Sequence, residues 1–412
     1  MLIILVSWCL ITYFALCMGL AFNKVWCCLS KQKRRITLDE TVMAGLCALT
    51  VYAQIFSLFH GVGLAANLLM LGLCVIVTCF CYRELLQVLD SFIKMKRIYW
   101  LGIAVALVII SMIGAGGNEQ YDTGLYHAQA VRWIEEYGVV KGLGCLHHRL
   151  AYNSSFLVLQ ALFGYRYLFG LEIHSLNVYI AFILMLWAGH AFLAHRTRMF
   201  SLSDMGRLLF LVYICKMRES VSSPGTDFFA VSLSIYILTK WLVLTEERCE
   251  EAEPYIYLCF LAVYAVTLKL SVAPIALLAV YPLYLLIKDK RFQLMGISAA
   301  TGAMIAAPFL IRNVILCGYL LFPFPSIDLF SVDWKLGLDE VIRCKQEVAV
   351  WGRGLCDMSK ADYSIGQWFP VWWSTLSFVS KVSVILFLIT FVIAVVRCVV
   401  ILCSHKPLQI RL

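Results

Sequence analysis

The chain has 412 residues, of which 62% are hydrophobic and 14% are charged, and its mean hydropathy is +0.85. An average soluble domain carries about 25% charged residues, so the composition excludes an ordinary soluble protein and predicts an all-α, polytopic integral membrane protein. The net charge of +9 is interpreted as a signal of membrane orientation, not of affinity for nucleic acid.

The first third of the chain contains four apolar segments that are long enough to be transmembrane helices. They are residues 2–22, 40–60, 62–82 and 98–114. Basic residues gather after the first segment (24–35) and after the third (83–97), and the positive-inside rule places both groups in the cytoplasm. The first segment lacks the basic leader of a signal peptide, so we expect an uncleaved helix with its N-terminus outside. The fourth segment then leads the chain to the non-cytoplasmic side.

The longest polar interval in the first half of the chain runs from Gly117 to Ser155, and residues 115–152 are expected to form an outer loop. Within it, residues 131–140 have the pattern of an amphipathic helix that rests on the membrane. The next segment, 153–168, is apolar but short for a span and includes Asn153, Gln160 and Arg166. We expect it to form a juxtamembrane helix near the outer interface.

Seven further spans are predicted in the rest of the chain, which brings the total to about eleven. They are residues 173–195, 206–217, 228–244, 255–268, 272–287, 293–311 and 372–396. The chain is predicted to be a single integral membrane domain with three parts. These are N-terminal helices (1–97), a core (98–340), and an outer loop followed by the last helix and a cytoplasmic tail (341–412).

This topology places four polar patches on the same, non-cytoplasmic side. The patches are Glu119 to Asn153, Arg218 to Asp227, Lys269 with Ser271, and Arg312 to Lys335. Charged residues near helix ends in a membrane are costly unless they are paired or hydrated, so their convergence predicts a shared functional site. The alternative interpretation is that each patch consists of ordinary solvated loop and interface residues.

Three motifs in these patches resemble segments of the GT-C superfamily of membrane glycosyltransferases, over about residues 98–340. NEQYDTGLYHAQAVRWIEEYG, followed by NSSFLVLQALFG, resembles the first outer loop of that superfamily, which bears an acidic catalytic residue and leads into juxtamembrane helices. SSPGTDFF resembles an outward turn with an aspartate before the next helix. APFLIRNVILCGYLLFPFP resembles P-x-x-x-RN-x-x-x-x-G-x-P-x-x-P of bacterial members but departs from it at Tyr319 and Leu320, where a proline would follow the glycine. The YDTGLYH loop is also similar to that of a group of uncharacterised bacterial membrane proteins.

The resemblance implies a transferase that moves a sugar from a polyprenyl phosphate or diphosphate to a glycan, lipid or protein acceptor, typically with inversion. It also implies a bacterial inner membrane with the active face periplasmic. Asp122 is the first expected catalytic residue and Glu119 the second, because one carboxylate suffices as general base toward an acceptor hydroxyl. The structural alternative for Asp122 is an N-cap, since a helix is expected to start near Gly124. No cofactor and no nucleic acid are expected as partners.

A leaving phosphate requires positive charge, which Lys and Arg provide through charge-assisted hydrogen bonds. The basic residues expected to provide it are, in order of preference, Lys269, Arg312, Arg218 and Arg149. The alternative for each is anchoring in the lipid headgroups. The other residues expected to bind substrate are His127, His148, Asn153, Asp227 and Asn313. The histidines, together with Asp122 and Glu119, are of types that bind a divalent metal ion, but their spacing matches no known ligand motif, and hydrogen bonds to sugar hydroxyls are favoured.

Three other classes of protein are weighed against a transferase. An O-antigen polymerase-like or ligase-like enzyme keeps a large outer loop late in the chain, and residues 312–370 fit that description. A lipid or glycan transporter is expected to show repeated halves and charged residues within its spans, and the sequence shows no such repeat. A non-enzymatic membrane scaffold is the third. The acidic loop early in the chain favours the transferase.

Overall fold

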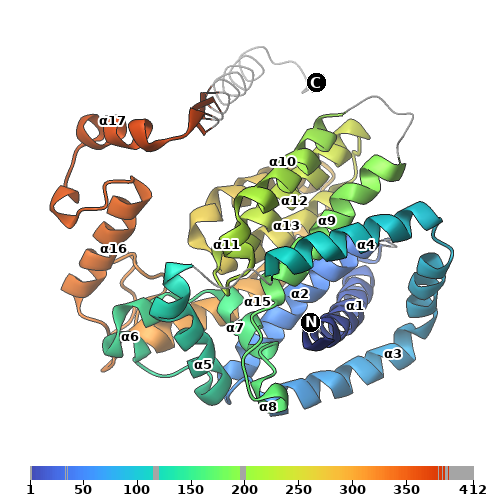
Figure 1. Cartoon of the computed structure of the whole chain (residues 1–412), viewed down its shortest axis with the longest axis horizontal. Coiled ribbons are helices and arrows are strands. Elements are labelled where there is room, and N and C mark those ends of the chain that lie inside the picture. Colours follow the sequence, from blue (N-terminus) through green and yellow to red (C-terminus); the bar gives the residue numbers. More distant parts are fainter. Residues whose placement is uncertain are drawn as a thin grey trace. The chain divides into compact units, whose positions relative to one another are not determined.

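The computed structural model describes residues 2–32, 34, 36–114, 120–194, 201–378, 380–382, 384, 385 and 388 (Figure 1). Every regular element among them is helical, as the all-α prediction requires. The chain forms two compact units. The larger unit comprises residues 1–322 and 326–336, and the smaller one comprises residues 323–325 and 337–412.

The larger unit contains fifteen α-helices among its described residues. They are α1 (Leu2–Ser30), α2 (Leu38–Ser57), α3 (Leu64–Ile93), α4 (Arg97–Gly114), α5 (Ala128–Tyr137), α6 (Leu143–Leu146), α7 (Ser155–Leu162), α8 (Arg166–Phe169), α9 (Leu176–Ala194), α10 (Leu202–Lys216), α11 (Arg218–Val221), α12 (Asp227–Glu246), α13 (Ala252–Leu268), α14 (Val280–Lys288) and α15 (Phe292–Cys317). A π-helical turn, η1 (Thr123–His127), precedes α5, and a 3₁₀ segment, η3 (Leu270–Ala279), precedes α14.

The smaller unit contains two described α-helices, α16 (Leu338–Gly352) and α17 (Ile365–Thr375), with a 3₁₀ turn, η4 (Met358–Lys360), between them. The start of α17 is fixed by a capping box, in which the Ser364 backbone N–H donates to the Gln367 side chain at 2.9 Å. The Arg353 guanidinium lies 5.1 Å from the ring centre of Trp368, which links the end of α16 to α17.

Seven segments among the described residues are long and apolar enough to cross a membrane. They are 3–30, 38–57, 64–90, 97–114, 227–246, 270–288 and 292–317. The chain is therefore a multi-pass integral membrane protein. Two shorter apolar helices, 176–192 and 252–268, coincide with further predicted spans. Only part of the predicted last span, 372–396, lies within the described residues, so the count of eleven stays a prediction.

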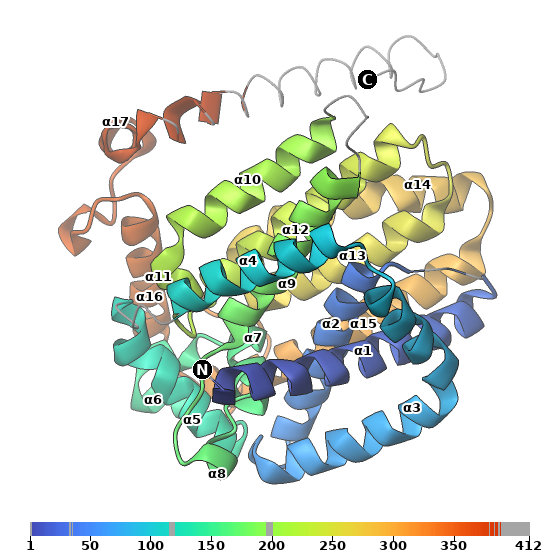
Figure 2. The same ribbon diagram turned by 45° about the vertical axis from the view of Figure 1, so that its right-hand side comes forward.

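The contact between α1 and α2 is close enough to require glycine. A Cβ atom added to Gly45 would overlap the carbonyl oxygen of Ala15, and one added to Gly19 would overlap the carbonyl oxygen of Thr41. Small residues allow helix backbones to approach in this way in membranes, where van der Waals contact provides much of the association energy. A second pair of apolar helices, α4 and α9, also packs side by side (Figure 2).

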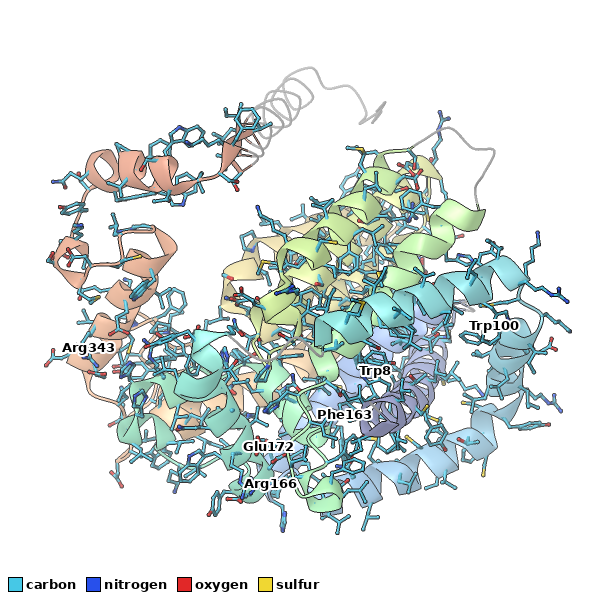
Figure 3. The ribbon with its side chains drawn as sticks, viewed as in Figure 1. Trp8, Trp100, Phe163, Arg166, Glu172 and Arg343 are labelled. Carbon is cyan, nitrogen blue, oxygen red and sulfur yellow. The ribbon has the colours of Figure 1, made fainter. Side chains whose placement is uncertain are left out.

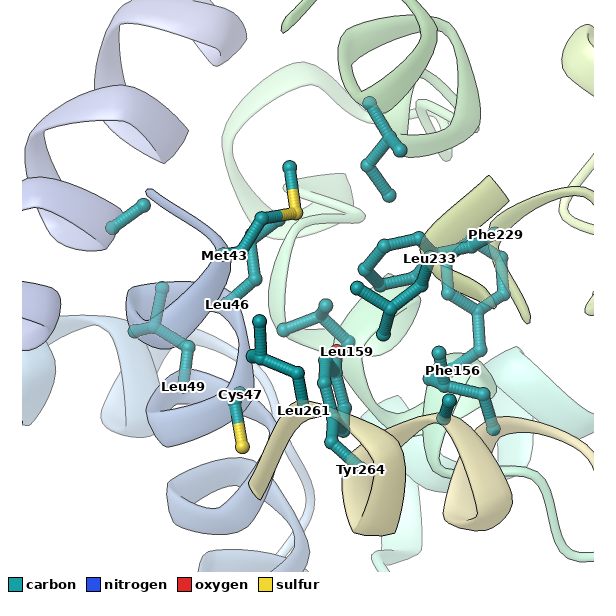
Figure 4. Close-up of a cluster of buried hydrophobic side chains, with 14 of the residues drawn as sticks. Met43, Leu46, Cys47, Leu49, Phe156, Leu159, Phe229, Leu233, Leu261 and Tyr264 are labelled. Carbon is teal, nitrogen blue, oxygen red and sulfur yellow. The ribbon is translucent and has the colours of Figure 1, made fainter. Parts of the chain in front are cut away.

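The short helix α7 lies in the middle of the larger unit. All eight of its residues are buried. Its Phe156 and Leu159 pack among side chains of α2, α12 and α13 (Figure 4). Eight helical residues rise only about 12 Å, so α7 is too short to cross a bilayer, as expected. Neighbouring helices enclose α7, so its faces contact protein, and its position near the outer interface stays a prediction.

The amphipathic helix predicted at 131–140 is present as α5, but its apolar face is used differently from the prediction. Ala130, Val131 and Ile134 are buried, and α5 packs against α7. Protein therefore covers the apolar side that was expected to rest on the membrane.

An ion-pair network joins the start of α2 to α12. The Lys240 Nζ atom lies 3.1 Å from Asp39 Oδ2 and 3.0 Å from Glu40 Oε1, and Arg34 lies 3.3 Å from Glu40. The Tyr236 hydroxyl donates to Asp39 at 2.6 Å. Since all five groups are paired, this network is best explained as a structural connection at the end of α2 opposite Ser57.

Candidate functional site

A single helical run carries the first predicted site residues. The chain is helical from Tyr121, passes through the π-helical turn η1, and continues as α5. Asp122 has helical backbone angles (φ −65°, ψ −20°), and its side chain makes no capping hydrogen bond. The N-cap interpretation of Asp122 is therefore wrong in this structure. Single π-helical turns within α-helices occur frequently at functional sites.

An ion pair joins two other polar patches. Asp227 is the first residue of α12, and Lys269 directly follows α13 in an extended conformation; the Lys269 ammonium pairs with Asp227 Oδ1. The Lys269 side chain is 38% exposed and the Asp227 side chain is 43% exposed, so both are accessible to a ligand. Burial lowers the pKa of Lys269, and the negative charge of Asp122 opposes that shift. Asp122 thus lies within electrostatic reach of the pair.

His127 completes this group. The residue is 3% exposed, and its Nδ1 atom has no hydrogen-bond partner in the described part of the chain. Burial, and secondly the charge of Lys269, lower the pKa of His127 to about 4. The imidazole is therefore neutral near pH 7 and offers a hydrogen-bonding nitrogen. We call Asp122, His127, Asp227 and Lys269 the Lys269 cluster.

The turn between α11 and α12 is held by a residue that the sequence did not single out. Asn177 of α9 is fully buried, and its Nδ2 atom donates to the carbonyl oxygens of Ser223 and Gly225, both at 2.8 Å. The Ser223 hydroxyl donates to the Gln120 side chain. These bonds fix both the approach to α12, where Asp227 lies, and the chain just before Asp122. The sequence feature that could have identified Asn177 is a single asparagine inside an apolar helix.

Arg312, in the last turns of α15, is 1% exposed. Its Nε atom donates to Asn153 Oδ1 at 3.3 Å, and another guanidinium nitrogen donates to the Ser57 hydroxyl. Asn153 in turn donates to the Phe309 carbonyl at 3.0 Å. The adjacent cavity has a volume of about 20 Å³, enough for about one water molecule but not for a phosphate. No described carboxylate lies within ion-pair distance of Arg312.

The segment after Asn153 connects this arginine to the Lys269 cluster. The Ser154 hydroxyl donates to the Leu268 carbonyl at 2.7 Å, and the Ser155 and Thr267 hydroxyl oxygens lie 2.9 Å apart. Residues 153–155 therefore fasten α15 and α2 to the end of α13, one residue before Lys269.

Arg149, His148 and Arg218, which were also predicted to bind substrate, have different surroundings. The Arg149 guanidinium lies 5.7 Å from the ring centre of Tyr126, next to His127. The His148 ring stacks on that of His147 at 4.8 Å. Arg218 is exposed and has no polar partner among the described residues, so the structure does not bring it into the Lys269 cluster.

The last two predicted site residues are Asn313 and Glu119. Asn313 is buried, and its side chain donates to the Leu320 carbonyl at 2.9 Å, which closes the turn after α15. Glu119, the second expected catalytic residue, lies outside the described residues.

A pair of carboxylates on α5 and after α8 was missed by the sequence analysis. Burial, and secondly the charge of Glu172, raise the pKa of Glu135 to about 8. Arg166 lies 3.4 Å from Glu172, and Arg132 lies 3.7 Å from it. Figure 3 labels Arg166 and Glu172. His174 Nε2 lies 3.5 Å from the other Glu172 oxygen. Glu135 is thus largely protonated at neutral pH.

The protonated Glu135 gives a testable pH dependence. Its pKa rises from 4.5 to about 8 on folding, so its stabilising effect is complete below pH 4.5 and is lost as the pH rises through about 8. The melting temperature of the detergent-solubilised protein is expected to fall over this range, and Glu135→Gln is expected to flatten the curve. Glu136→Gln, on the neighbouring, more exposed carboxylate, is the control and should keep the slope. Equal slopes for wild type and Glu135→Gln would contradict the assignment.

The described helices and the Lys269 cluster define a multi-pass membrane protein with a charged, accessible site at one end of its helices. Residues 1–410 match the model of the family described as domain of unknown function DUF8201, and the chain belongs to this family. Comparisons with curated proteins and with solved structures found no match.

Proposed function

We propose that this protein is a membrane glycosyltransferase that moves a sugar from a polyprenyl-phosphate-linked donor to an acceptor hydroxyl. The observation that carries the proposal is the Lys269 cluster, in which an accessible cation lies near a carboxylate that accepts no hydrogen bond from the described side chains. Asp122, Asp227 and Lys269 come from three separate regions of the sequence. The regions of Asp122 and Asp227 also carry GT-C-like motifs.

Asp122 is assigned the role of general base. In the proposed reaction it takes the proton of the acceptor hydroxyl, whose oxygen forms a bond to the anomeric carbon of the sugar. The bond between that carbon and the phosphate oxygen breaks, and the polyprenyl phosphate or diphosphate leaves with the electron pair. Attack from the face opposite the leaving group inverts the anomeric centre.

Lys269 is assigned to the leaving phosphate. A preorganised cation stabilises charge that develops in the transition state. Asp227 orients the ammonium through the ion pair. The neutral His127 is buried beside this pair and is therefore assigned to shaping the site and not to contact with the sugar. Arg312, being enclosed, is assigned to positioning Asn153 and the start of α7 and not to substrate binding.

The proposed location is a bacterial inner membrane, with the Lys269 cluster on the periplasmic face. Support comes from the direction of the helices. The C-terminal ends of α2, α13 and α15 approach this cluster. Arg34, Glu253 and Arg291 lie at or just before the N-terminal ends of the same helices. The basic segment 24–35 follows the positive-inside rule only in this orientation.

The proposal is tested by deleting the protein in its host and analysing surface glycans and lipid-linked sugars. We expect a surface glycan to lose a sugar and its lipid-linked donor to accumulate on the outer face of the membrane. Accumulation on the inner face would support a transporter, and an altered chain length with unchanged sugars would support a polymerase. Either result, or an unchanged glycan, would contradict the proposal.

A further inference from the structure

A cavity of about 270 Å³ lies at the opposite end of the helices from the Lys269 cluster. It is formed where the end of α1 meets the turn between α14 and α15, and its lining includes Ser30, Lys31, Lys290, Arg291 and Gln293. Ligand pockets for drug-sized molecules measure roughly 300–1,000 Å³, so this cavity suits a small headgroup.

The charged lining is positive. Lys31 and Lys290 are exposed, and neither has an ion-pair partner in the described part of the chain. Arg291 pairs with Glu253, which holds its side chain in place. Three basic side chains therefore line one cavity, and of these three only Arg291 has a carboxylate partner among the described residues.

The backbone at both lysines is unusual. Lys31 has φ 57° and Lys290 has φ 53°, in the left-handed region that favours glycine. For another residue this conformation costs about 1–2 kcal/mol. Lysines occupy positions just after the ends of α1 and α14 where glycine is the common choice. The charge at these two positions is thus present despite a backbone cost.

Two further features of the lining favour an anion. Phe292, Gln293 and Leu294 form the first turn of the 26-residue helix α15, which no described side chain caps. The first N–H groups of a helix lack intrahelical acceptors and carry partial positive charge, so they attract anions. The Ser30 hydroxyl oxygen is also buried and has no hydrogen-bond partner among the residues that the structure describes.

The cavity has apolar neighbours that face outward. Leu29 is 48% exposed and Phe292 is 56% exposed, and both belong to the lining. In a membrane, such side chains lie against acyl chains while basic residues beside them meet the headgroups.

We propose that this cavity binds a phosphate-bearing anion through Lys31, Lys290 and the first turn of α15. The shared chemistry is a phosphate group; an acidic phospholipid headgroup and free phosphate are the two possible sources. The site is separate from the Lys269 cluster and does not depend on the proposed transferase activity.

The test uses the purified full-length chain in phosphatidylcholine nanodiscs, with phosphatidic acid or inorganic phosphate added in separate titrations. Binding is followed by native mass spectrometry and by the melting temperature. We expect one of the two probes to bind the wild type, and the double variant Lys31→Ala/Lys290→Ala to weaken that binding at least about tenfold. Binding of phosphatidic acid alone identifies a lipid site; binding of inorganic phosphate identifies a site for the free anion.

Lys288→Ala is the matched control, because Lys288 is an exposed lysine at the end of α14 that does not line the cavity. Its affinity for each probe is expected to equal that of the wild type. An equal loss in the control would show general attraction of anions to this surface and would overturn the proposal. So would unchanged binding by the double variant, or no binding of either probe by the wild type.

Discussion

Asp122→Asn is expected to lower sugar transfer by about 10²- to 10⁴-fold, the usual contribution of a general base. The amide keeps the size of the side chain but does not accept a proton at neutral pH. The fold is expected to be unchanged, because the Asp122 side chain makes no capping hydrogen bond. The measurement is the amount of surface glycan restored in a deletion strain, normalised to the amount of protein in the membrane.

Asp333→Asn is the matched control for this variant, since Asp333 is exposed and has no polar side-chain partner in the described residues. It should restore the glycan fully. Full restoration by Asp122→Asn at wild-type protein levels would remove Asp122 from the proposed mechanism.

The second large effect is expected on folding. Gly45→Val places a branched side chain where even a Cβ atom would overlap the Ala15 carbonyl oxygen. Overpacking a core commonly costs about 1–3 kcal/mol, and a collision with backbone belongs at or above the upper end because α1 and α2 have to separate. We expect little folded protein after detergent extraction, measured as the monodisperse fraction in size-exclusion chromatography.

Gly72→Val provides the comparison, because no atom lies within 4 Å of a Cβ added to Gly72 of α3. Its folded yield is expected to match the wild type. A normal yield from Gly45→Val would show that the close contact between α1 and α2 is not needed.

Composition was sufficient to predict the membrane class and most helices, because a bilayer core accepts few other structures for an apolar chain. The predicted alternation of the spans also placed the regions around Asp122, Asp227 and Lys269 on the same side of the membrane. The structure brings these three residues together. Their catalytic roles remain part of the proposal.

What the sequence did not reveal depends on tertiary contacts. Arg312 and Arg218 look alike as basic residues near helix ends, yet Arg312 is enclosed and Arg218 is exposed. Hydropathy shows that α7 is apolar but not whether lipid or protein surrounds it. Glu135 and Glu172 are far apart in sequence, so their proximity follows only from the fold.

Transfer by the purified protein tests the central claim most directly. The wild type in nanodiscs would be given a panel of polyprenyl-phosphate-linked radiolabelled sugars and acceptor-containing membrane extract from the deletion strain. The account predicts that label moves from the polyprenyl carrier to an acceptor with the wild type, and at least about a hundredfold more slowly with Asp122→Asn. Equal rates for the two proteins, or no transfer from any donor by well-folded wild type, would contradict it.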